Sequence, residues 1–170
     1  MKLAARNQGT RLGNRLERDE KAIHSLSESE FSVLPSDSGA LPRARIFFDT
    51  DDTLLTWNWR LRPFAREVLA ELGAAGFAVY LWSGRGKRWE VVEIFNLAAY
   101  VLDCFEKPLF RHRERLAELG VPFAPDYVVD DHAEIVDAFG GLCVLPPREP
   151  LEHDRELLRV LDDLRRRFPW

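Results

Sequence analysis

The chain has 170 residues, of which 46% are hydrophobic and 31% are charged, and its formal net charge is −4 at pH 7. This length fits one domain with a single core, and the acidic balance argues against a broad nucleic-acid-binding surface. No stretch approaches the roughly 20 apolar residues of a membrane span or has the apolar centre of a signal peptide, so we expect a cytosolic protein without a membrane partner.

Residues 1–43 are predicted to form a polar extension and linker rather than part of a core. Apolar residues are widely spaced at first, and the segment LPSDSGALP, residues 34–42, is rich in Pro, Ser and Gly. A short helix in this extension would need a partner to be stable, so we expect a disordered or partly helical tail. The folded domain is therefore predicted to span residues 44–170.

From residue 44 onward, short apolar segments alternate with segments of helical periodicity. The apolar segments lack polar alternation, which indicates strands buried on both faces and therefore a parallel sheet covered by helices on both sides. We predict a Rossmann-like α/β fold with about five strands. The strands are expected at residues 44–49, 77–82, 100–105, 126–130 and 142–145, and the helices at residues 62–76, 87–98, 110–120, 133–141 and 149–168.

Polar side chains with complementary charges follow four successive predicted strands. Asp49 ends the first strand, Ser83 follows the second, Lys107 follows the third, and Asp130 and Asp131 end the fourth. Because ligands of open α/β sheets bind outside the carboxyl ends of the strands, we expect these side chains to converge on one site. Carboxylates at a buried strand end need a counter-charge, their oxygens suit Mg²⁺, and a lysine and a hydroxyl suit a phosphate group. The sequence therefore predicts a site for phosphoryl transfer.

The same residues resemble the motifs of a known enzyme family. The segment DTDDT, residues 49–53, resembles the Asp-x-Asp-x-Thr signature of the haloacid dehalogenase superfamily. FAVYLWS (77–83), KP (107–108) and YVVDD (127–131) are similar to its second, third and fourth motifs and occur in the same order. The resemblance covers residues 44–146 and implies a sheet with the first strand central. It also implies a catalytic domain that hydrolyses phosphomonoesters with Mg²⁺ through an aspartyl-phosphate intermediate.

The resemblance assigns a catalytic role to four residues. Asp49 would be the nucleophile that attacks phosphorus, and Asp51 would protonate the leaving oxygen and then deprotonate the attacking water. Ser83 would hydrogen-bond the transferring phosphoryl group. Lys107 would neutralise the charge that nucleophile and phosphate bring together.

The oxygens that the resemblance assigns to Mg²⁺ come from two of the predicted strand ends. Asp49 and the main-chain carbonyl of Asp51 would supply ligands from the first motif. Asp131 would bind the metal directly, with Asp130 in support. The sequence alone leaves open which member of this pair is the direct ligand.

The domain is predicted to carry no cap over its site. The family inserts cap domains after the first motif or between the third and fourth motifs, and both connections are short here. Ten positions separate Thr53 from Pro63, and 23 separate Lys107 from Asp130. Members without a cap often act on macromolecules or borrow a lid from a neighbouring subunit, and the sequence does not specify an oligomeric state.

Without a cap, residues around the open rim are expected to select the substrate. Trp57, Trp59 and Arg85 lie near the first two motifs, where they could stack an aromatic ring and hold a phosphate. The two tryptophans could equally pack against the edge of the core. Thr53 is expected to fix the loop beside the substrate, and Gly84 is expected to allow close approach of the backbone.

Other functions share parts of this pattern. The segments SGR and VVDDHAEIVDAFGGLCV resemble the 3′-phosphatase domain of phage polynucleotide kinases, and capless protein phosphatases share Arg-Pro at the start of the first helix. A polynucleotide 3′-phosphatase, for which nucleic acid is only a substrate, and a phosphoprotein phosphatase therefore stay open. A non-catalytic module that binds phosphate and metal also stays open. A response-regulator receiver is rejected because its acidic pair comes first and its acceptor Asp stands alone on the third strand.

Overall fold

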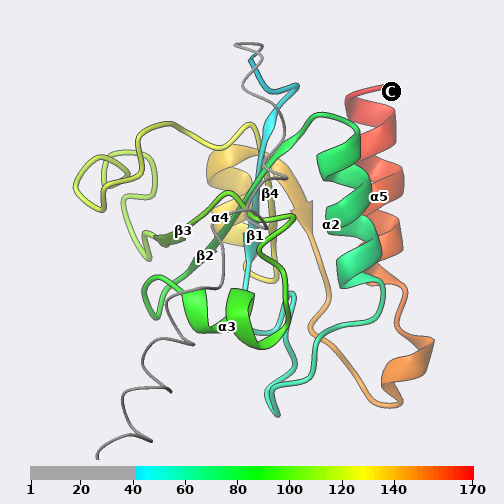
Figure 1. The fold of residues 1–170 in the computed structure, drawn as a ribbon. Helices are drawn as coiled ribbons and strands as arrows, with labels where there is room; N and C mark the ends of the chain where they lie inside the picture. The colour runs from blue at the N-terminus through cyan, green and yellow to red at the C-terminus, as the bar shows by residue number, and fades with distance from the viewer. Residues whose placement is uncertain (1–40) are drawn as a thin grey trace, which may run out of the picture. The chain divides into compact units, whose positions relative to one another are not determined.

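Five parallel strands form the centre of the computed structural model, which describes residues 41–170 (Figure 1). The strands are β1 (Arg45–Asp49), β2 (Ala78–Ser83), β3 (Asp103–Glu106), β4 (Tyr127–Asp130) and β5 (Gly141–Cys143). They lie in the order β3-β2-β1-β4-β5, which places the first strand in the middle. The predicted Rossmann-like α/β sheet is therefore confirmed. Residues 1–40 of the predicted extension lie outside the described residues.

Helices cover both faces of the sheet, as the apolar strands predicted. The helices are α2 (Ala65–Ala74), α3 (Trp89–Ile94), α4 (Ala133–Phe139), the 3₁₀ turn η1 (Leu151–His153) and α5 (Glu156–Arg167). Helices α2, α3 and α5 share one apolar core with one face of the sheet, and α4 shares a second core with the other face. Figure 1 shows α2 and α5 side by side, and Arg165 of α5 pairs with Glu71 of α2 at 2.6 Å.

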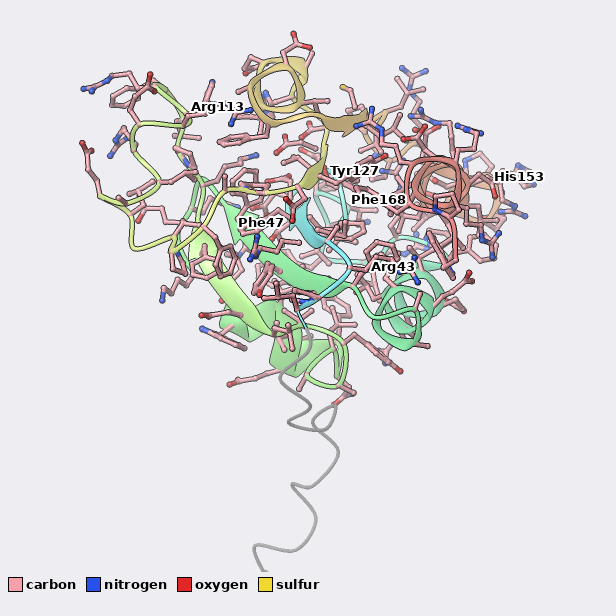
Figure 2. All side chains as sticks on the ribbon, turned by 90° about the horizontal axis from the view of Figure 1, so that it is seen from above. Arg43, Phe47, Arg113, Tyr127, His153 and Phe168 are labelled. Atoms are coloured by element: carbon pink, nitrogen blue, oxygen red, sulfur yellow. The ribbon has the colours of Figure 1, made fainter. Side chains whose placement is uncertain are left out.

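Alternation along β1 explains this two-sided core. Ile46 and Phe48 belong to the core under α2, α3 and α5, whereas Phe47 belongs to the core under α4, and all three side chains are fully buried. The ring of Phe47 lies 4.9 Å from the ring of Tyr80 on β2. Figure 2 shows Phe47 on one side of β1 and Tyr127 on the side of α5. Because β1 is packed on both faces, the backbone that carries Asp49 is held firmly.

The predicted helix over residues 110–120 is wrong. The segment forms consecutive turns, and Arg111 has a φ of 48°, in the left-handed region. Leu116 is the one buried residue between residue 110 and residue 120, so the segment has too little apolar surface to fix a whole helix against the sheet. It is instead tied to α4 by Arg113, which donates to the carbonyl oxygen of Ala138 at 2.6 Å (Figure 2).

Several predicted boundaries shift: α3 is shorter than predicted, and the last predicted helix is divided into η1 and α5, which begins at Glu156. Two other shifts follow from backbone hydrogen bonds. Strand β3 begins at Asp103 rather than residue 100, since Val101 still donates to the carbonyl oxygen of Leu97 and closes the turn after α3. Arg43, which the sequence placed in the linker, is already bound to the domain. Its N–H donates to the carbonyl oxygen of Gly76 at 2.9 Å.

The connections that could carry a cap are short, as predicted. Within residues 41–170, neither the segment after β1 nor the segment between β3 and β4 contains an additional domain. We refer to residues 54–62, which follow β1, as the flap. In the same part of the chain, no helix is both long enough and apolar enough to span a bilayer.

A buried arginine holds the flap against the end of the domain. Arg62 is 1% exposed, and its guanidinium lies 2.9 Å from a carboxylate oxygen of Asp154. The same group donates to the carbonyl oxygen of Thr53 at 3.1 Å and to that of Leu145 at 2.7 Å. Arg62 therefore ties the loop after β1 to the segments that follow β5 and η1.

Replacing Arg62 with Met is expected to lower the free energy of unfolding by about 3–5 kcal/mol, because Asp154 and two carbonyl oxygens lose their buried donor. Chemical denaturation would measure this loss. Arg60→Met is the matched control, since Arg60 pairs with Glu149 at the surface at 3.1 Å. The control should change stability by less than about 1 kcal/mol. Equal losses of stability in the two variants would show that the buried contacts of Arg62 do not stabilise the fold.

Candidate functional site

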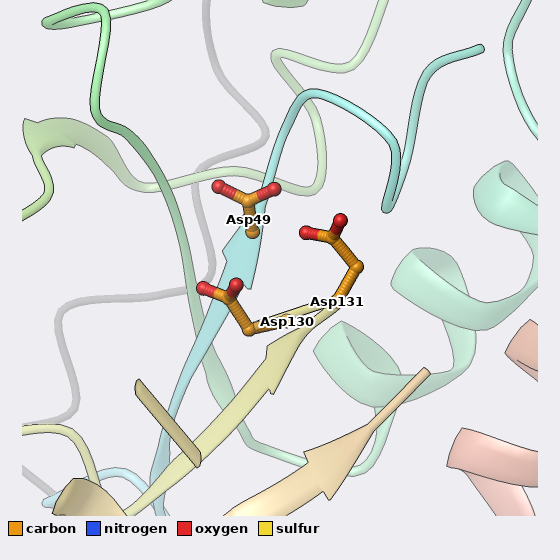
Figure 3. Close-up of side chains that lie close together, drawn as sticks. All are labelled: Asp49, Asp130 and Asp131. Carbon is orange, nitrogen blue, oxygen red and sulfur yellow. The ribbon is translucent and has the colours of Figure 1, made fainter. Parts of the chain in front are cut away.

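The candidate site lies where the order of the strands reverses. The chain passes from β1 outward to β2 and β3, and then returns to place β4 on the other side of β1. Such a switch point leaves a crevice outside the carboxyl ends of the two diverging strands. Asp49 ends β1 and Asp130 ends β4, so both carboxylates face this crevice (Figure 3). Asp131 follows directly, and ligand oxygens of the three residues all lie within 4.8 Å of one another.

Lys107 supplies the counter-charge that these carboxylates need. Its Nζ lies 2.6 Å from Asp49 Oδ1 and 3.0 Å from Asp130 Oδ2. All three side chains are buried. The backbone N–H of Lys107 donates to the carbonyl oxygen of Ser83 at 2.9 Å, which ties the lysine to the end of β2. The structure therefore brings together the predicted residues at the ends of β1, β2, β3 and β4.

The site carries more negative than positive charge. When all three carboxylates are ionised they face one ammonium, which leaves two negative charges uncompensated. Burial, with the neighbouring charge of Asp130, raises the pKa of Asp49 to about 7, although Lys107 opposes this shift. Burial also raises the pKa of Asp130. Burial would lower the pKa of Lys107, but its two carboxylate partners outweigh this effect and raise it.

The donor set fits a hard divalent cation. All three side chains offer carboxylate oxygens, which Mg²⁺ and Ca²⁺ prefer to nitrogen or sulfur. A charge of +2 would also balance the two uncompensated negative charges. Asp130 is fully buried and already binds Lys107 and the backbone N–H of His132. Asp131 has a side chain that is 14% exposed, so it is the more accessible carboxylate of the pair.

Asp51 lies in a separate network beside this cluster. Its Oδ2 accepts a hydrogen bond from the hydroxyl of Ser83 at 3.0 Å and another from the guanidinium of Arg88. Arg85 Nη1 lies 3.7 Å from the other carboxylate oxygen. Ser83, predicted to bind a phosphoryl group, thus donates to Asp51 here. The hydroxyl oxygen of Ser83 also accepts from the N–H of Arg85 at 3.1 Å.

Hydrogen bonds of the backbone and the side chain of Thr50 hold the loop after β1. The N–H groups of Leu54 and Leu55 both donate to the carbonyl oxygen of Thr50, and the hydroxyl of Thr50 donates to the carbonyl oxygen of Trp82 at 3.0 Å. Asp52 has a φ of 57°, a left-handed conformation that aspartate tolerates better than most residues.

Thr53 was expected to fix this loop beside the substrate. The residue is fully buried, and its side-chain hydroxyl has no hydrogen-bond partner. It lines neither of the two hollows described below, so its position is suited to shaping the loop and not to touching a ligand.

Two adjoining hollows open at this edge of the sheet. The first, which we call the main hollow, has a volume of about 220 Å³. It is lined by Asp49, Asp51, Asp52, Ser83, Gly84, Arg85, Lys107, Leu109, Asp131, His132, Glu134 and Ile135. The second, the flap hollow, has a volume of about 180 Å³. It is lined by Asp51, Asp52, Leu55, Thr56, Trp57, Trp59 and Arg85.

The predicted rim residues therefore line these hollows. Gly84 and Arg85 reach the main hollow, and both tryptophans line the flap hollow. Trp57 is 83% exposed and Trp59 is 45% exposed, so neither side chain belongs to the hydrophobic core.

The basic run GRGKR was expected to supply cations at the rim, but the burial of Arg88 was not predicted, because an arginine in such a run is normally solvated. No property of that segment alone signals its burial, since its partners are distant in sequence. Leu109 and Ile135 were also missed, because apolar residues near a charged site carry no distinguishing pattern.

No known protein-family model matches this chain, and a search of curated proteins finds no significant match. The candidate site is thus defined by its own residues and their geometry.

Proposed function

We propose that the chain is a Mg²⁺-dependent phosphomonoester hydrolase of the haloacid dehalogenase type. The observation that carries the proposal is the buried cluster of Asp49, Asp130 and Lys107 at the switch point of the sheet, with Asp131 beside it. Asp51 lines the same hollow and is held by separate partners. One carboxylate held against an ammonium and a second carboxylate at the edge of the cluster supply a nucleophile and a group that can transfer protons.

The reaction that we propose has two steps. The carboxylate of Asp49 attacks phosphorus, the bond from phosphorus to the leaving oxygen breaks, and Asp51 gives its proton to that oxygen. Asp51 then takes a proton from water, and the resulting hydroxide attacks the aspartyl-phosphate, which releases inorganic phosphate and restores Asp49. Lys107 stabilises both steps because its ammonium lies against the nucleophile.

Asp49, Asp131 and the main-chain carbonyl of Asp51 would hold the Mg²⁺ ion, with Asp130 in support. When bound, Mg²⁺ supplies positive charge that offsets the repulsion between the phosphate and the carboxylates. The charge count of the cluster supports this assignment, since it lacks two positive charges.

The direct test is release of inorganic phosphate from a panel of phosphomonoesters with Mg²⁺ and with chelator. The panel contains p-nitrophenyl phosphate, sugar phosphates, nucleotides, 3′-phosphorylated oligonucleotides and phosphopeptides. We expect Mg²⁺-dependent release from at least one class. Release from the oligonucleotides or the phosphopeptides alone would assign a 3′-phosphatase or a phosphoprotein phosphatase. Ligand binding without any release of phosphate would contradict the hydrolase and would indicate a non-catalytic binding module.

Mg²⁺ is expected to stabilise the folded protein, because a preformed cluster of carboxylates binds the ion only in the folded state. At a concentration 100 times Kd, the gain is about 2.7 kcal/mol, which corresponds to roughly 5–10 °C in Tm. Melting curves with Mg²⁺, with chelator and with NaCl of equal ionic strength would measure it. Asp131→Asn should remove most of the gain, and a wild-type curve indifferent to Mg²⁺ would contradict the metal site.

A cytosolic location is part of the proposal. The two cysteines of the chain, Cys104 and Cys143, form no disulfide. Unpaired cysteines are usual in a reducing compartment. Localisation of a tagged full-length chain would test it, and an exported protein would contradict it.

A further inference from the structure

The flap hollow adjoins the main hollow at the residue that the proposed reaction uses for proton transfer. The two hollows share Asp51, Asp52 and Arg85. If phosphorus is attacked by Asp49 in the main hollow, the leaving group lies beside Asp51. The flap hollow is the space on that side of the site. Its volume of about 180 Å³ is smaller than the roughly 300–1,000 Å³ of pockets that enclose a whole drug-sized ligand, so it suits a single ring.

Trp59 forms a firm wall of this hollow. The guanidinium carbon of Arg88 lies 5.1 Å from the centroid of its ring, and Arg88 is itself only 4% exposed. Arg88 is fixed in turn by Asp51 and by Glu90. One side of the indole is thus backed by a buried cation, whereas Trp59 as a whole stays 45% exposed at the hollow.

The turn that carries Trp59 is also fixed. Its backbone N–H donates to the carbonyl oxygen of Thr56 at 3.1 Å, and the N–H of Arg60 donates to the hydroxyl of Thr56 at 2.9 Å. That hydroxyl donates to Asn58 Oδ1 at 2.6 Å. Trp57 lies in the same turn but has 83% of its surface exposed, and no cation of the described residues backs its ring as Arg88 backs that of Trp59. Of the two tryptophans, Trp59 therefore loses less conformational freedom when a ring stacks on it.

The charges around the flap hollow restrict what can enter. Asp51 and Asp52 contribute two carboxylates, and Arg85 contributes one guanidinium. Arg85 and Arg88 are already paired with Asp51. A second phosphate on the leaving group would therefore compete with this carboxylate and meet that of Asp52, whereas an uncharged ring would meet none of this repulsion.

We infer that the flap hollow is a leaving-group subsite for a flat aromatic ring without further negative charge, with Trp59 as its stacking surface and Arg88 as the residue that positions it. The inference rests on the proposed function, because it takes the phosphoryl group to occupy the main hollow. The substrate is then a phosphomonoester whose alcohol carries a ring, either a nucleoside or a phenol.

The test compares ligands that differ only in the ring. Calorimetry would measure the binding of adenosine 5′-monophosphate and ribose 5-phosphate, with Mg²⁺, to the Asp49→Asn variant, which prevents turnover. A stacked ring is expected to tighten binding by about 5- to 150-fold. Phosphotyrosine and phosphoserine form a second pair, which distinguishes a phenol from a nucleoside.

Trp59→Asn in the same background should remove this preference, and Trp59→Phe should restore most of it. Asn is chosen because Trp59 has a φ of 59°, which Asn tolerates. Trp57→Asn is the contrasting variant and should keep the preference. Absence of a ring preference in both pairs, survival of the preference in Trp59→Asn, or its loss only in Trp57→Asn would each overturn the inference.

Turnover by the wild type separates this inference from the proposed function. A wild-type protein that binds the ring through Trp59 but releases no phosphate would contradict the hydrolase and support the subsite. A wild-type protein that hydrolyses both members of each pair equally well, with no dependence on Trp59, would overturn the subsite and support the hydrolase.

Discussion

Asp49→Asn is expected to abolish phosphate release while the fold is retained. The substitution keeps the shape of a buried side chain but replaces the carboxylate that attacks phosphorus in the proposed reaction. We expect kcat to fall by at least about 10,000-fold, the scale on which hydrolases respond to loss of their nucleophile. Phosphate release from the best substrate of the panel would measure it.

Asp137→Asn is the matched control, because Asp137 is an exposed carboxylate on α4 outside both hollows. It should leave turnover within about 2-fold of the wild type, as expected of a surface change far from the chemistry. If Asp49→Asn retained turnover near that of the control, Asp49 would not be the nucleophile and the proposed reaction would be wrong.

The same substitution should change how the metal-free protein responds to pH. The pKa of Asp49 is raised from 3.8 to about 7 in the folded state, so the folded protein holds this proton more tightly than the unfolded chain. Stability of the metal-free wild type should therefore fall as the pH rises from 3.8 through about 7. Asp49→Asn should show a smaller fall, which denaturation with chelator at several pH values would measure.

The fold was predictable because its strands are buried on both faces. Phe47 and Phe48 face different cores, so β1 is apolar at successive positions, and this continuous pattern indicates a parallel sheet without further information. The convergence of Asp49, Lys107 and Asp130 followed, because each stands at the carboxyl end of a strand or just after it. The central position of β1 came from the resemblance, since apolar runs do not specify strand order.

The segment over residues 110–120 could not be predicted in the same way. It has helix-forming residues, but helices in proteins are stabilised mainly by packing, and the segment offers one buried side chain, Leu116. Its conformation follows from contacts with α4, such as the bond from Arg113 to Ala138. Local propensity contains no information about that partner.

The burial of Arg62 and Arg88 was not predicted, for a related reason. Arg62 lies 92 positions from Asp154, and Arg88 lies 37 positions from Asp51. An arginine is normally exposed, and only the folded chain shows that these two are buried against a carboxylate partner. The burial of these two arginines therefore became visible only once the distant segments were placed.

Lys107→Met is expected to impair both turnover and stability. The substitution leaves three carboxylates at the site without their fixed cation, although it preserves most of the side-chain volume. Loss of a buried partner of this kind costs about 3–5 kcal/mol, so the metal-free variant should unfold at a markedly lower denaturant concentration. Turnover should fall by at least about 1,000-fold, because the ammonium beside the nucleophile no longer stabilises the negative charge of the transition state.

Mg²⁺ should separate these two effects. In the variant, the carboxylates lack the positive charge of Lys107, and the ion supplies positive charge in its place. Mg²⁺ should therefore raise the Tm of Lys107→Met by more than it raises the Tm of the wild type. Turnover should not recover, because the ammonium binds Asp49 at a fixed position that a second cation does not reproduce.

Lys87→Met is the control for removing a lysine, because Lys87 is exposed and its Nζ lies 5.8 Å from the ring centroid of Phe105. It should lose less than about 1 kcal/mol of stability. If Lys107→Met melted like this control in chelator, the carboxylates would not depend on the ammonium. Repulsion among them would then have to be relieved by protonation, and the charge argument for a divalent cation would fail with it.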